Sequence, residues 1–229
     1  MDKDTLILFT MPGTCSTGPH ILLESLNIPY KVCLVDGKIL ESDWYVKINP
    51  QKQVGALRHG DLVLYENSAI LSYLANKYYS LSPVVAQNNP ERFGHIMQWL
   101  SFITTTVHPY FAIYYHSERF ISEVNNSDLL QHVVERLKKN YTSVNNHLSA
   151  NKYLTGDEYA ICDFEAYAVL RWAFVDNIFT TNDFPHIARF LDDMSTLQCI
   201  KNVNAIESND VAKLVGGKFT GYVDSTTIS

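Results

Sequence analysis

Short apolar runs alternate with amphipathic stretches along the first part of the chain. Residues 6–10 and 30–35 are apolar or β-branched and have the length of buried strands, and residues 19–26 between them have the spacing of a helix. Two further apolar runs flank Gly60-Asp61, a pair typical of a β-hairpin turn. Residues 67–79 again place apolar side chains on one face of a helix. This order, β-α-β followed by β-β-α, predicts an α/β domain that begins with a parallel strand pair.

The pattern changes after residue 80. Residues 81–89 are rich in Ser, Pro, Asn and Gln and predict a linker, and Pro90-Glu91 is a common helix start. Beyond it only helical patterns occur, so we expect an all-α domain over residues 90–215, with helices at residues 90–123, 128–149, 163–177 and 187–195 and a shorter one near residue 201. Residues 216–229 lack helical periodicity and are predicted to form a mobile tail. The fold class is therefore α/β plus all-α, with a thioredoxin-like domain at residues 1–80.

The composition supports a globular protein and argues against several kinds of partner. The 229 residues are 46% hydrophobic and 18% charged, enough for a large core. A net charge of −6, without a Lys/Arg block, argues against nucleic acid. With no signal-peptide organisation and no apolar run of membrane-spanning length, we expect a cytoplasmic protein with no membrane partner. The four cysteines lack the spacing of a zinc site or a disulfide framework, so no metal is expected.

Cys15 is the candidate reactive residue, because it follows a predicted strand and precedes a predicted helix. Pro12-Gly13 ends the strand, and Pro19 is tolerated in a first helical turn. The N–H groups at a helix start favour a thiolate and lower the pKa of a cysteine there. Ser16 adds a hydroxyl at the same turn. The alternative is that Cys15 is a small buried apolar residue, as free cysteines usually are.

The motifs along the chain together resemble one family. The sequence Pro-Gly-x-Cys-Ser-x-x-Pro-His-Ile at residues 12–21 is similar to that of the glutathione transferases, and of their bacterial beta class in particular. Residues 49–57 resemble the family's loop before the third strand, and residues 66–74 its glutathione-binding third helix. Residues 99–108 and 153–173 are similar to its fourth-helix and sixth-helix regions. The resemblance implies a homodimer that uses glutathione as a co-substrate.

The resemblance also implies roles for individual residues. The γ-glutamyl end of glutathione carries a carboxylate, which suits Asn67 and the N–H groups of a helix start, and an ammonium, which suits Glu66. The residues implied for catalysis are Cys15, Ser16 and His108, and those implied for glutathione binding are Lys38, Val54, Glu66 and Asn67. A hydrophobic electrophile is expected beside the fourth helix, near Tyr110, Phe111, Tyr114 and Trp172, although aromatic side chains at helical spacing are usually core residues.

Three positions depart from the family pattern. Val54-Gly55 stands where the family has Val-Pro with a cis peptide bond. Because a cis bond before a residue other than proline costs roughly 2.5–4 kcal/mol, we expect a trans bond, a rearranged loop and weak binding of glutathione. Pro109 stands where beta-class members often have Lys and should bend the helix. Ala160 lacks the hydroxyl that would complete a capping box with Asp163.

Three functions follow from these residues. In conjugation, ionised glutathione attacks a hydrophobic electrophile while Cys15 holds or activates its sulfur. In thiol-disulfide transfer, Cys15 itself forms a mixed disulfide with glutathione. The third alternative is a scaffold without enzymatic activity that binds ligands or proteins and has lost affinity for glutathione, and Gly55 is the residue that favours it.

Overall fold

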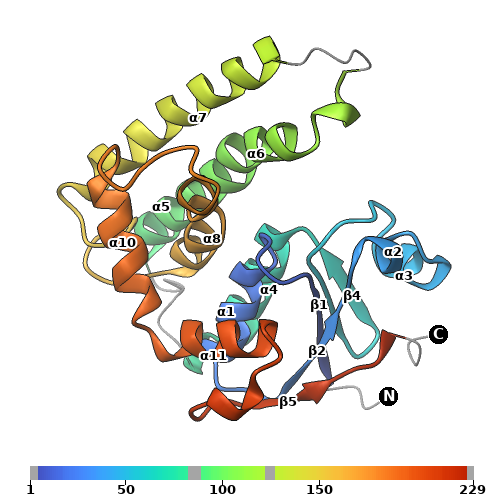
Figure 1. The fold of residues 1–229 in the computed structure, drawn as a ribbon. Coiled ribbons are helices and arrows are strands. Elements are labelled where there is room, and N and C mark those ends of the chain that lie inside the picture. The colour runs from blue at the N-terminus through green and yellow to red at the C-terminus, as the bar shows by residue number, and fades with distance from the viewer. Residues whose placement is uncertain (1–4, 82–88, 122–126, 226–229) are drawn as a thin grey trace.

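The computed structural model describes residues 5–81, 89–121 and 127–225, and the described chain begins in a five-stranded sheet (Figure 1). The strands are β1 (Leu6–Thr10), β2 (Tyr30–Leu34), β3 (Ala56–His59), β4 (Leu62–Tyr65) and β5 (Phe219–Tyr222). Their spatial order is β4-β3-β1-β2-β5. β1 pairs in parallel with β2, β3 pairs antiparallel with β1, and β3 and β4 form the predicted hairpin. The predicted order of elements is confirmed.

Helices cover both faces of this sheet. α1 (Thr17–Ser25) and α4 (Asn67–Lys77) pack on one face, and the short α2 (Gly37–Leu40) and α3 (Asp43–Ile48) lie on the other. Successive residues of β1 therefore face different cores: Leu6 and Leu8 contact α1, whereas Ile7 and Phe9 pack with Tyr45 of α3. A strand that is buried on both faces has a continuous apolar sequence, which is why residues 6–10 show no alternation.

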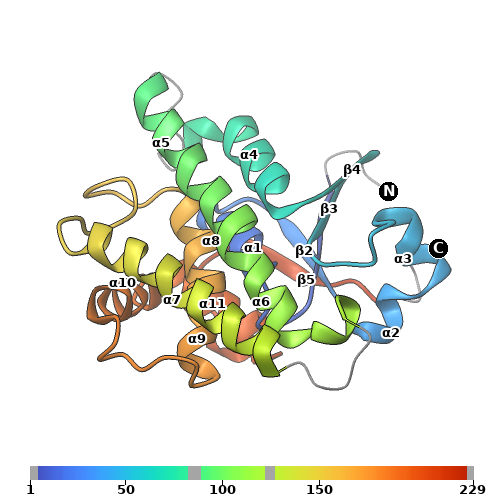
Figure 2. The ribbon, with the colours of Figure 1, turned by 90° about the horizontal axis from the view of Figure 1, so that it is seen from above.

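The helical domain is built around α8 (Ile161–Leu170), in which every residue is buried. α8 lies between α1 and the segment formed by α5 (Pro90–Ser101) and α6 (His108–Tyr115), as Figure 2 shows. The remaining helices are α7 (Ser127–Leu148), α9 (Trp172–Val175), α10 (Pro185–Ser195) and α11 (Gln198–Glu207), with short 3₁₀ turns at Tyr79–Leu81, Ser117–Arg119 and Val211–Lys213. None of the helices within the described ranges is long and apolar enough to cross a membrane.

The single helix expected at residues 90–123 is interrupted. A π-helical segment, η2 (Phe102–Val107), separates α5 from α6 just before Pro109. Proline cannot donate the backbone hydrogen bond that a continuous α-helix needs, and insertion of a π-turn is one way in which a helix accommodates such a change. Residues 122–126 and most of the predicted linker, residues 82–88, lie outside the described residues.

The C-terminal segment differs from the expected mobile tail, because it contains β5. This strand pairs in parallel with β2, and the Thr220 hydroxyl donates a hydrogen bond to the Tyr30 carbonyl at 2.8 Å. Four residues with glycine among them give little sequence signal, and the strand forms because β2 leaves an unpaired edge at that position.

Asp163 closes the start of α8 although Ala160 has no side-chain acceptor. Its fully buried carboxyl accepts the N–H of Ala160 and the N–H of Leu154, each at 2.8 Å. The half of a capping box that Asp163 can supply is therefore present, and the same side chain also holds the preceding loop. Burial raises the pKa of Asp163 to about 6, against the effect of these two donors.

Replacing Asp163 by alanine should destabilise the protein, because it leaves two buried N–H groups without an acceptor. We expect Asp163→Ala to lower the free energy of unfolding by about 2–4 kcal/mol, and Asp163→Asn, which keeps one oxygen, to lower it less. Urea denaturation at neutral pH measures both. Asp157→Ala, at an exposed position in the preceding loop, is the matched control and should change stability little. Equal effects at positions 157 and 163 would contradict this account.

Candidate functional site

Cys15 lies in the turn between β1 and α1, where the sequence placed it. It is 8% exposed, and its Sγ is 3.7 Å from the carbonyl oxygen of Val54, to which the thiol donates. Val54 belongs to the loop before β3, so the sheet brings together two residues that are far apart in the sequence. The structure thus places the candidate thiol beside the loop that the sequence predicts to bind glutathione.

The expectation that the start of α1 lowers the pKa of Cys15 is wrong. The N–H groups of Cys15 and Ser16 at the start of α1 do lower it, as does the Asn67 side chain, but burial and the Glu165 carboxylate outweigh them. The net effect raises the pKa of Cys15 to about 12. Desolvation penalises a thiolate more than one helix terminus stabilises it, so the side chain is a thiol at neutral pH.

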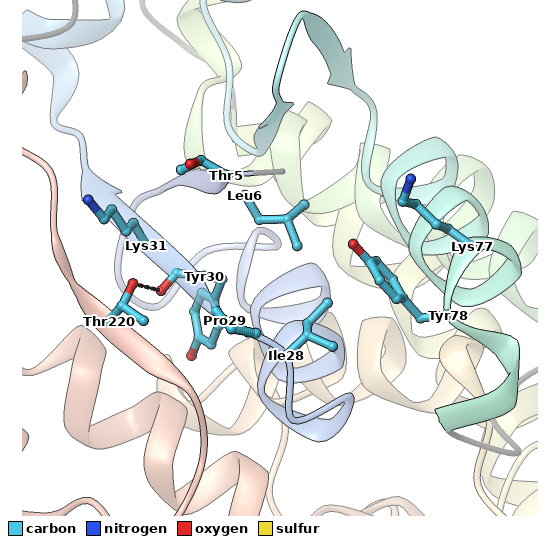
Figure 3. Close-up of a pocket in the computed structure, with 9 residues that line it drawn as sticks. All are labelled: Thr5, Leu6, Ile28, Pro29, Tyr30, Lys31, Lys77, Tyr78 and Thr220. Atoms are coloured by element: carbon cyan, nitrogen blue, oxygen red, sulfur yellow. Dashed lines mark hydrogen bonds between the residues drawn. The ribbon is translucent and has the colours of Figure 1, made fainter. Parts of the chain in front are cut away.

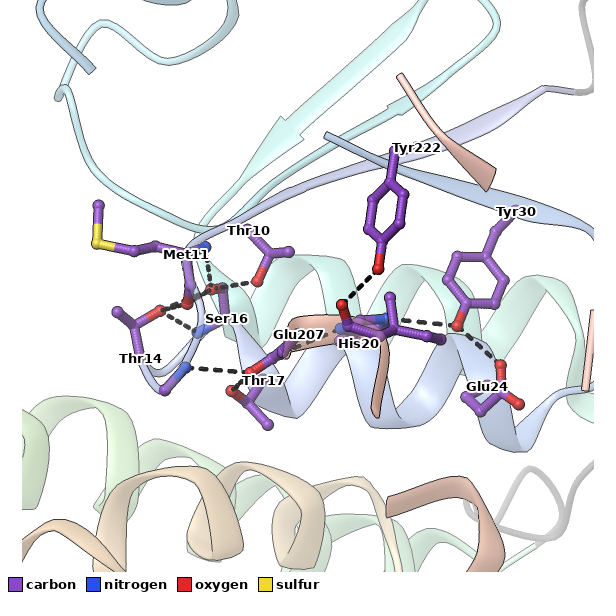
Figure 4. A network of polar contacts seen from close by, with 12 residues as sticks. Thr10, Met11, Thr14, Ser16, Thr17, His20, Glu24, Tyr30, Glu207 and Tyr222 are labelled. Carbon is purple, nitrogen blue, oxygen red and sulfur yellow. Dashed lines mark hydrogen bonds and ion pairs between the residues drawn. The ribbon is translucent and has the colours of Figure 1, made fainter. Parts of the chain in front are cut away.

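The Ser16 hydroxyl is used inside the turn. It is fully buried and lies 2.7 Å from the hydroxyls of both Thr10 and Thr14 (Figure 4). It also accepts the N–H of Met11 at 3.3 Å. These contacts hold the turn together, so the geometry gives Ser16 the role of shaping the Cys15 turn.

The Val54–Gly55 peptide bond is cis, which overturns the expectation of a trans bond and a rearranged loop. The N–H of Gly55 donates to Asn67 Oδ1 at 3.3 Å. A Cβ atom at position 55 would lie 3.0 Å from Cβ of Ser16 and 3.3 Å from Asn67 Oδ1. Glycine therefore fits a position where the Cys15 turn and the start of α4 both approach the backbone.

Asn67 was expected to bind the glutathione carboxylate, but its amide is buried and already has partners. While Oδ1 accepts from Gly55, Nδ2 donates to Glu165, at 3.1 Å from Oε1 and 3.4 Å from Oε2. Glu165 lies on α8 and is 1% exposed. Asn67 therefore links the loop before β3 to the helical domain, and its role toward the glutathione carboxylate stays a prediction.

Glu165 is the residue of this site that sequence reasoning missed. Together with Asp163 it is one of two carboxylic acids in α8, and an acid within an otherwise apolar helix was the available signal. None of the ion pairs formed by residues in the described ranges includes it. Burial raises the pKa of Glu165 to about 8, and the Asn67 amide offsets this only in part.

Lys38 and Glu66 are both exposed. Lys38 lies in α2, where its backbone N–H donates to Asp36 at 2.9 Å. Glu66 precedes α4 with a φ of 74°. Both side chains are at the surface of the sheet domain, and their roles toward glutathione stay predictions.

His108 and Trp172 lie side by side, with ring centroids 5.6 Å apart. The Trp172 indole also donates to the carbonyl oxygen of Gly13 at 2.8 Å, in the turn that carries Cys15. Trp172 thus joins His108 to this turn, although the two residues come from different helices. Burial lowers the pKa of His108, so its imidazole is neutral at neutral pH.

The aromatic residues predicted for the electrophile divide into two groups. Phe111 is fully buried and packs against Trp172, with centroids 5.3 Å apart, so it is a core residue and does not line an accessible surface. Tyr110 and Tyr114 are half-buried on α6 and pack against the core. They leave part of each ring exposed near the His108 end of the helical domain.

A cavity of about 520 Å³ lies elsewhere, at the opposite end of β1 from Cys15 (Figure 3). The buried Leu6 and Ile28 and the exposed Lys31 and Lys77 are among the residues that line it. None of the residues predicted for the site lines it.

The fold is therefore that of a two-domain protein, a sheet domain with a cysteine at the start of its first helix joined to an all-helical domain that reaches back to that turn. Residues 4–76 match the family model for the glutathione S-transferase N-terminal domain, and residues 95–198 match the model for its C-terminal domain. The chain belongs to the glutathione S-transferase family.

Two relatives agree with this assignment, and a solved structure shares the fold. The chain is 30% identical over 170 residues to glutathione S-transferase GST-4.5 of Xanthomonas campestris pv. campestris, covering 72% of this chain and 81% of that protein. It is 30% identical over 192 residues to glutathione S-transferase GstA of Escherichia coli O157:H7, covering 82% and 92%. The fold is similar to a glutathione S-transferase from Xylella fastidiosa, with a TM-score of 0.81 at 22% identity and coverage of 92% and 100%.

Glu165→Gln should remove a pH dependence of stability. The pKa of Glu165 is about 8 when folded and lies near its ordinary value when unfolded, so the folded protein holds a proton that the unfolded chain has lost. The stabilisation that this proton gives is fully present below the pKa of Glu165 in the unfolded chain. It is lost as pH rises through the pKa of Glu165 in the folded protein. Between pH ~6.5 and ~9 the loss is about 2 kcal/mol, which lowers the Tm by roughly 4–8 °C.

Thermal unfolding across this pH range measures the effect, and the Tm of Glu165→Gln should change much less than that of the unmodified protein. Asp163 titrates at a lower pH, so it does not dominate this range. Glu91→Gln, at an exposed position on α5, is the control for the loss of one negative charge. Parallel pH curves for the unmodified protein and Glu165→Gln would contradict the prediction.

Proposed function

We propose that this protein conjugates glutathione to hydrophobic electrophiles, with Cys15 holding the glutathione sulfur. Membership of the glutathione S-transferase family supports transferase activity with this co-substrate. A related fold, the sphingomonad glutathione S-transferase, is described as a complex with glutathione, at a TM-score of 0.77 and 19% identity. The electrophile class and the role of the cysteine are the parts that we infer.

The observation that carries the proposal is the contact between Cys15 and Val54. Glutathione can lie along the loop before β3 with its cysteinyl part at Val54, its γ-glutamyl end at the start of α4 near Glu66, and its sulfur at Cys15. These three positions come from separate elements of the sheet domain. Lys38 on α2 adds a positive charge at the same surface, which suits the second carboxylate of glutathione.

Conjugation is favoured over thiol-disulfide transfer by the protonation state of Cys15. With its pKa raised to about 12, Cys15 is a hydrogen-bond donor, and a donor stabilises the thiolate of bound glutathione. Thiol transfer requires Cys15 to be the attacking thiolate, which burial disfavours. His108, whose pKa is lowered, is neutral and suited to accept the proton that glutathione loses. Transfer through a mixed disulfide is the second candidate function.

Variants of Cys15 separate these two reactions. Serine keeps a donor but cannot form a disulfide, whereas alanine does neither. We expect Cys15→Ala to lower kcat/KM for conjugation of glutathione with an activated aryl halide by about 10- to 100-fold, and Cys15→Ser to lower it by less than about tenfold. Both variants should lose glutathionylation by oxidised glutathione, which adds one glutathionyl group to Cys15 and releases one glutathione.

Cys199→Ala is the control, because Cys199 is the other cysteine that is not fully buried. Peptide mass mapping locates the adduct. Full conjugation activity in Cys15→Ala would disprove the role of the cysteine. If the unmodified protein neither turns over nor binds immobilised glutathione, the non-enzymatic scaffold is the correct alternative.

We also propose that the protein is a homodimer. Large side chains are exposed on β4, after α4 and on α5, elements that lie along one side of the protein in Figure 2: Tyr65 is 38% exposed, Tyr79 55% and Phe93 38%. A two-fold dimer that buries this side would cover them. Sedimentation equilibrium at micromolar concentration should give about twice the chain mass of 26.1 kDa. Phe93→Asp should shift the protein toward monomer, and a monomeric unmodified protein would exclude the proposal.

A further inference from the structure

The turn that carries Cys15 is held by residues from the far end of the chain. The N–H of Gly13 donates to Glu207 Oε2 at 3.0 Å, and the carbonyl oxygen of Gly13 accepts from the Trp172 indole at 2.8 Å. Glu207 ends α11, and Trp172 begins α9. Both polar backbone atoms of one residue, two positions before Cys15, are thus bound by the helical part of the protein.

Glu207 also binds the first turns of α1. Its carboxylate accepts from the Thr17 hydroxyl, at 3.2 Å from Oε1 and 3.1 Å from Oε2, and it lies 3.1 Å from Nδ1 of His20 (Figure 4). The Glu207 side chain is 6% exposed and that of His20 is fully buried. Arg171 donates to the same Thr17 hydroxyl at 3.0 Å. The Glu207 carboxylate therefore contacts Gly13 before Cys15 and Thr17 and His20 after it. Hydrogen bonds to a carboxylate are among the stronger ones in proteins.

The helix that presents Glu207 is itself fixed to the sheet domain. Asn202 on α11 donates to Glu24 of α1 at 2.7 Å, and Glu24 accepts from the Tyr30 hydroxyl at 2.7 Å. The Tyr222 hydroxyl of β5 donates to the Ile206 carbonyl at 2.6 Å. Since the matched C-terminal domain ends at residue 198, Glu207 lies beyond both family models. This part of the chain is therefore tied to the candidate site by contacts that the family assignment does not cover.

We propose that Glu207 is a positioning residue, which holds the turn of Cys15 in place through Gly13, Thr17 and His20. It does not touch Cys15 in the structure and acts through the backbone of the turn. We expect Glu207 to suppress the local opening of the turn that exposes the Cys15 thiol. Through the same turn we expect it to position the sulfur of bound glutathione. The second effect rests on the proposed function, and the first does not.

The rate at which each cysteine is alkylated tests the proposal without reference to turnover. A buried thiol reacts through transient opening, so a weaker hold on the turn raises its rate. Glu207→Ala should raise the alkylation rate of Cys15 by iodoacetamide at least about fivefold, because three contacts to a buried carboxylate are lost. Glu207→Gln keeps an acceptor for Gly13 and should remain within about twofold of the unmodified protein.

The other cysteines separate local opening from general destabilisation. Cys33 and Cys162 are fully buried in other parts of the molecule and should keep their rates in Glu207→Ala. Val203→Ala, which removes a fully buried side chain from α11, is the matched control for loss of helix packing. It should lower the Tm without selectively raising the Cys15 rate. Asn204→Ala, at an exposed position of α11, should change neither quantity.

The outcomes are distinct. A rise confined to Cys15 in Glu207→Ala, with recovery in Glu207→Gln, supports the positioning role. An equal rise at all three cysteines, or an equal rise at Cys15 in Val203→Ala, would overturn it. If the unmodified protein shows conjugation, kcat/KM for glutathione should fall about fivefold or more in Glu207→Ala and recover in Glu207→Gln. A protein without this activity would refute the proposed function and leave the alkylation test valid.

Discussion

Gly18 on α1 lies so close to α8 that a Cβ atom there would be 2.4 Å from Oε2 of Glu165 and 3.1 Å from its Cα. The two helices can approach this far only because position 18 has no side chain. This approach brings the Glu165 carboxylate to the Asn67 amide, and Asn67 then holds the N–H of Gly55. The arrangement of the loop before β3, and with it the contact of Val54 with Cys15, depends on how closely α1 packs against α8. The helical domain thus shapes the loop beside Cys15 and does more than cover it.

Burial, more than charge, sets the chemistry of this site. A helix N-terminus stabilises a nearby anion, but the effect is modest and local, whereas complete desolvation of a thiolate is costly. At Cys15 both effects are present, and the pKa rises to about 12 because burial is the larger and Glu165 adds to it. The same reasoning applies to Glu165, whose partner is a neutral amide, and to His108, whose burial keeps it neutral. The three groups are predominantly uncharged near neutral pH.

The end of the chain is part of the same structure. β5 extends the sheet beside β2, and α11 packs along α1, so the chain returns to the domain in which it began. Four buried polar side chains, His20, Tyr30, Glu24 and Asn202, connect these elements by hydrogen bonds. Buried polar groups specify one arrangement because an alternative packing would leave them without partners. The position of the Cys15 turn is consequently defined by elements from both ends of the sequence.

The sequence by itself determined the order of elements in the sheet domain, the all-helical character of the second domain and the place of Cys15, because apolar spacing and the turn residues around Gly13 and Gly60 are local signals. It also indicated the family, from motifs that are confirmed as glutathione S-transferase domains. Only the tertiary structure decided the protonation of Cys15, the burial of Phe111 and Asn67, the strand at Phe219–Tyr222 and the part of Glu165 and Glu207 in the site. Each of these depends on contacts between residues that are distant in sequence, and desolvation and hydrogen bonding across such contacts have no signature in the local pattern of residues.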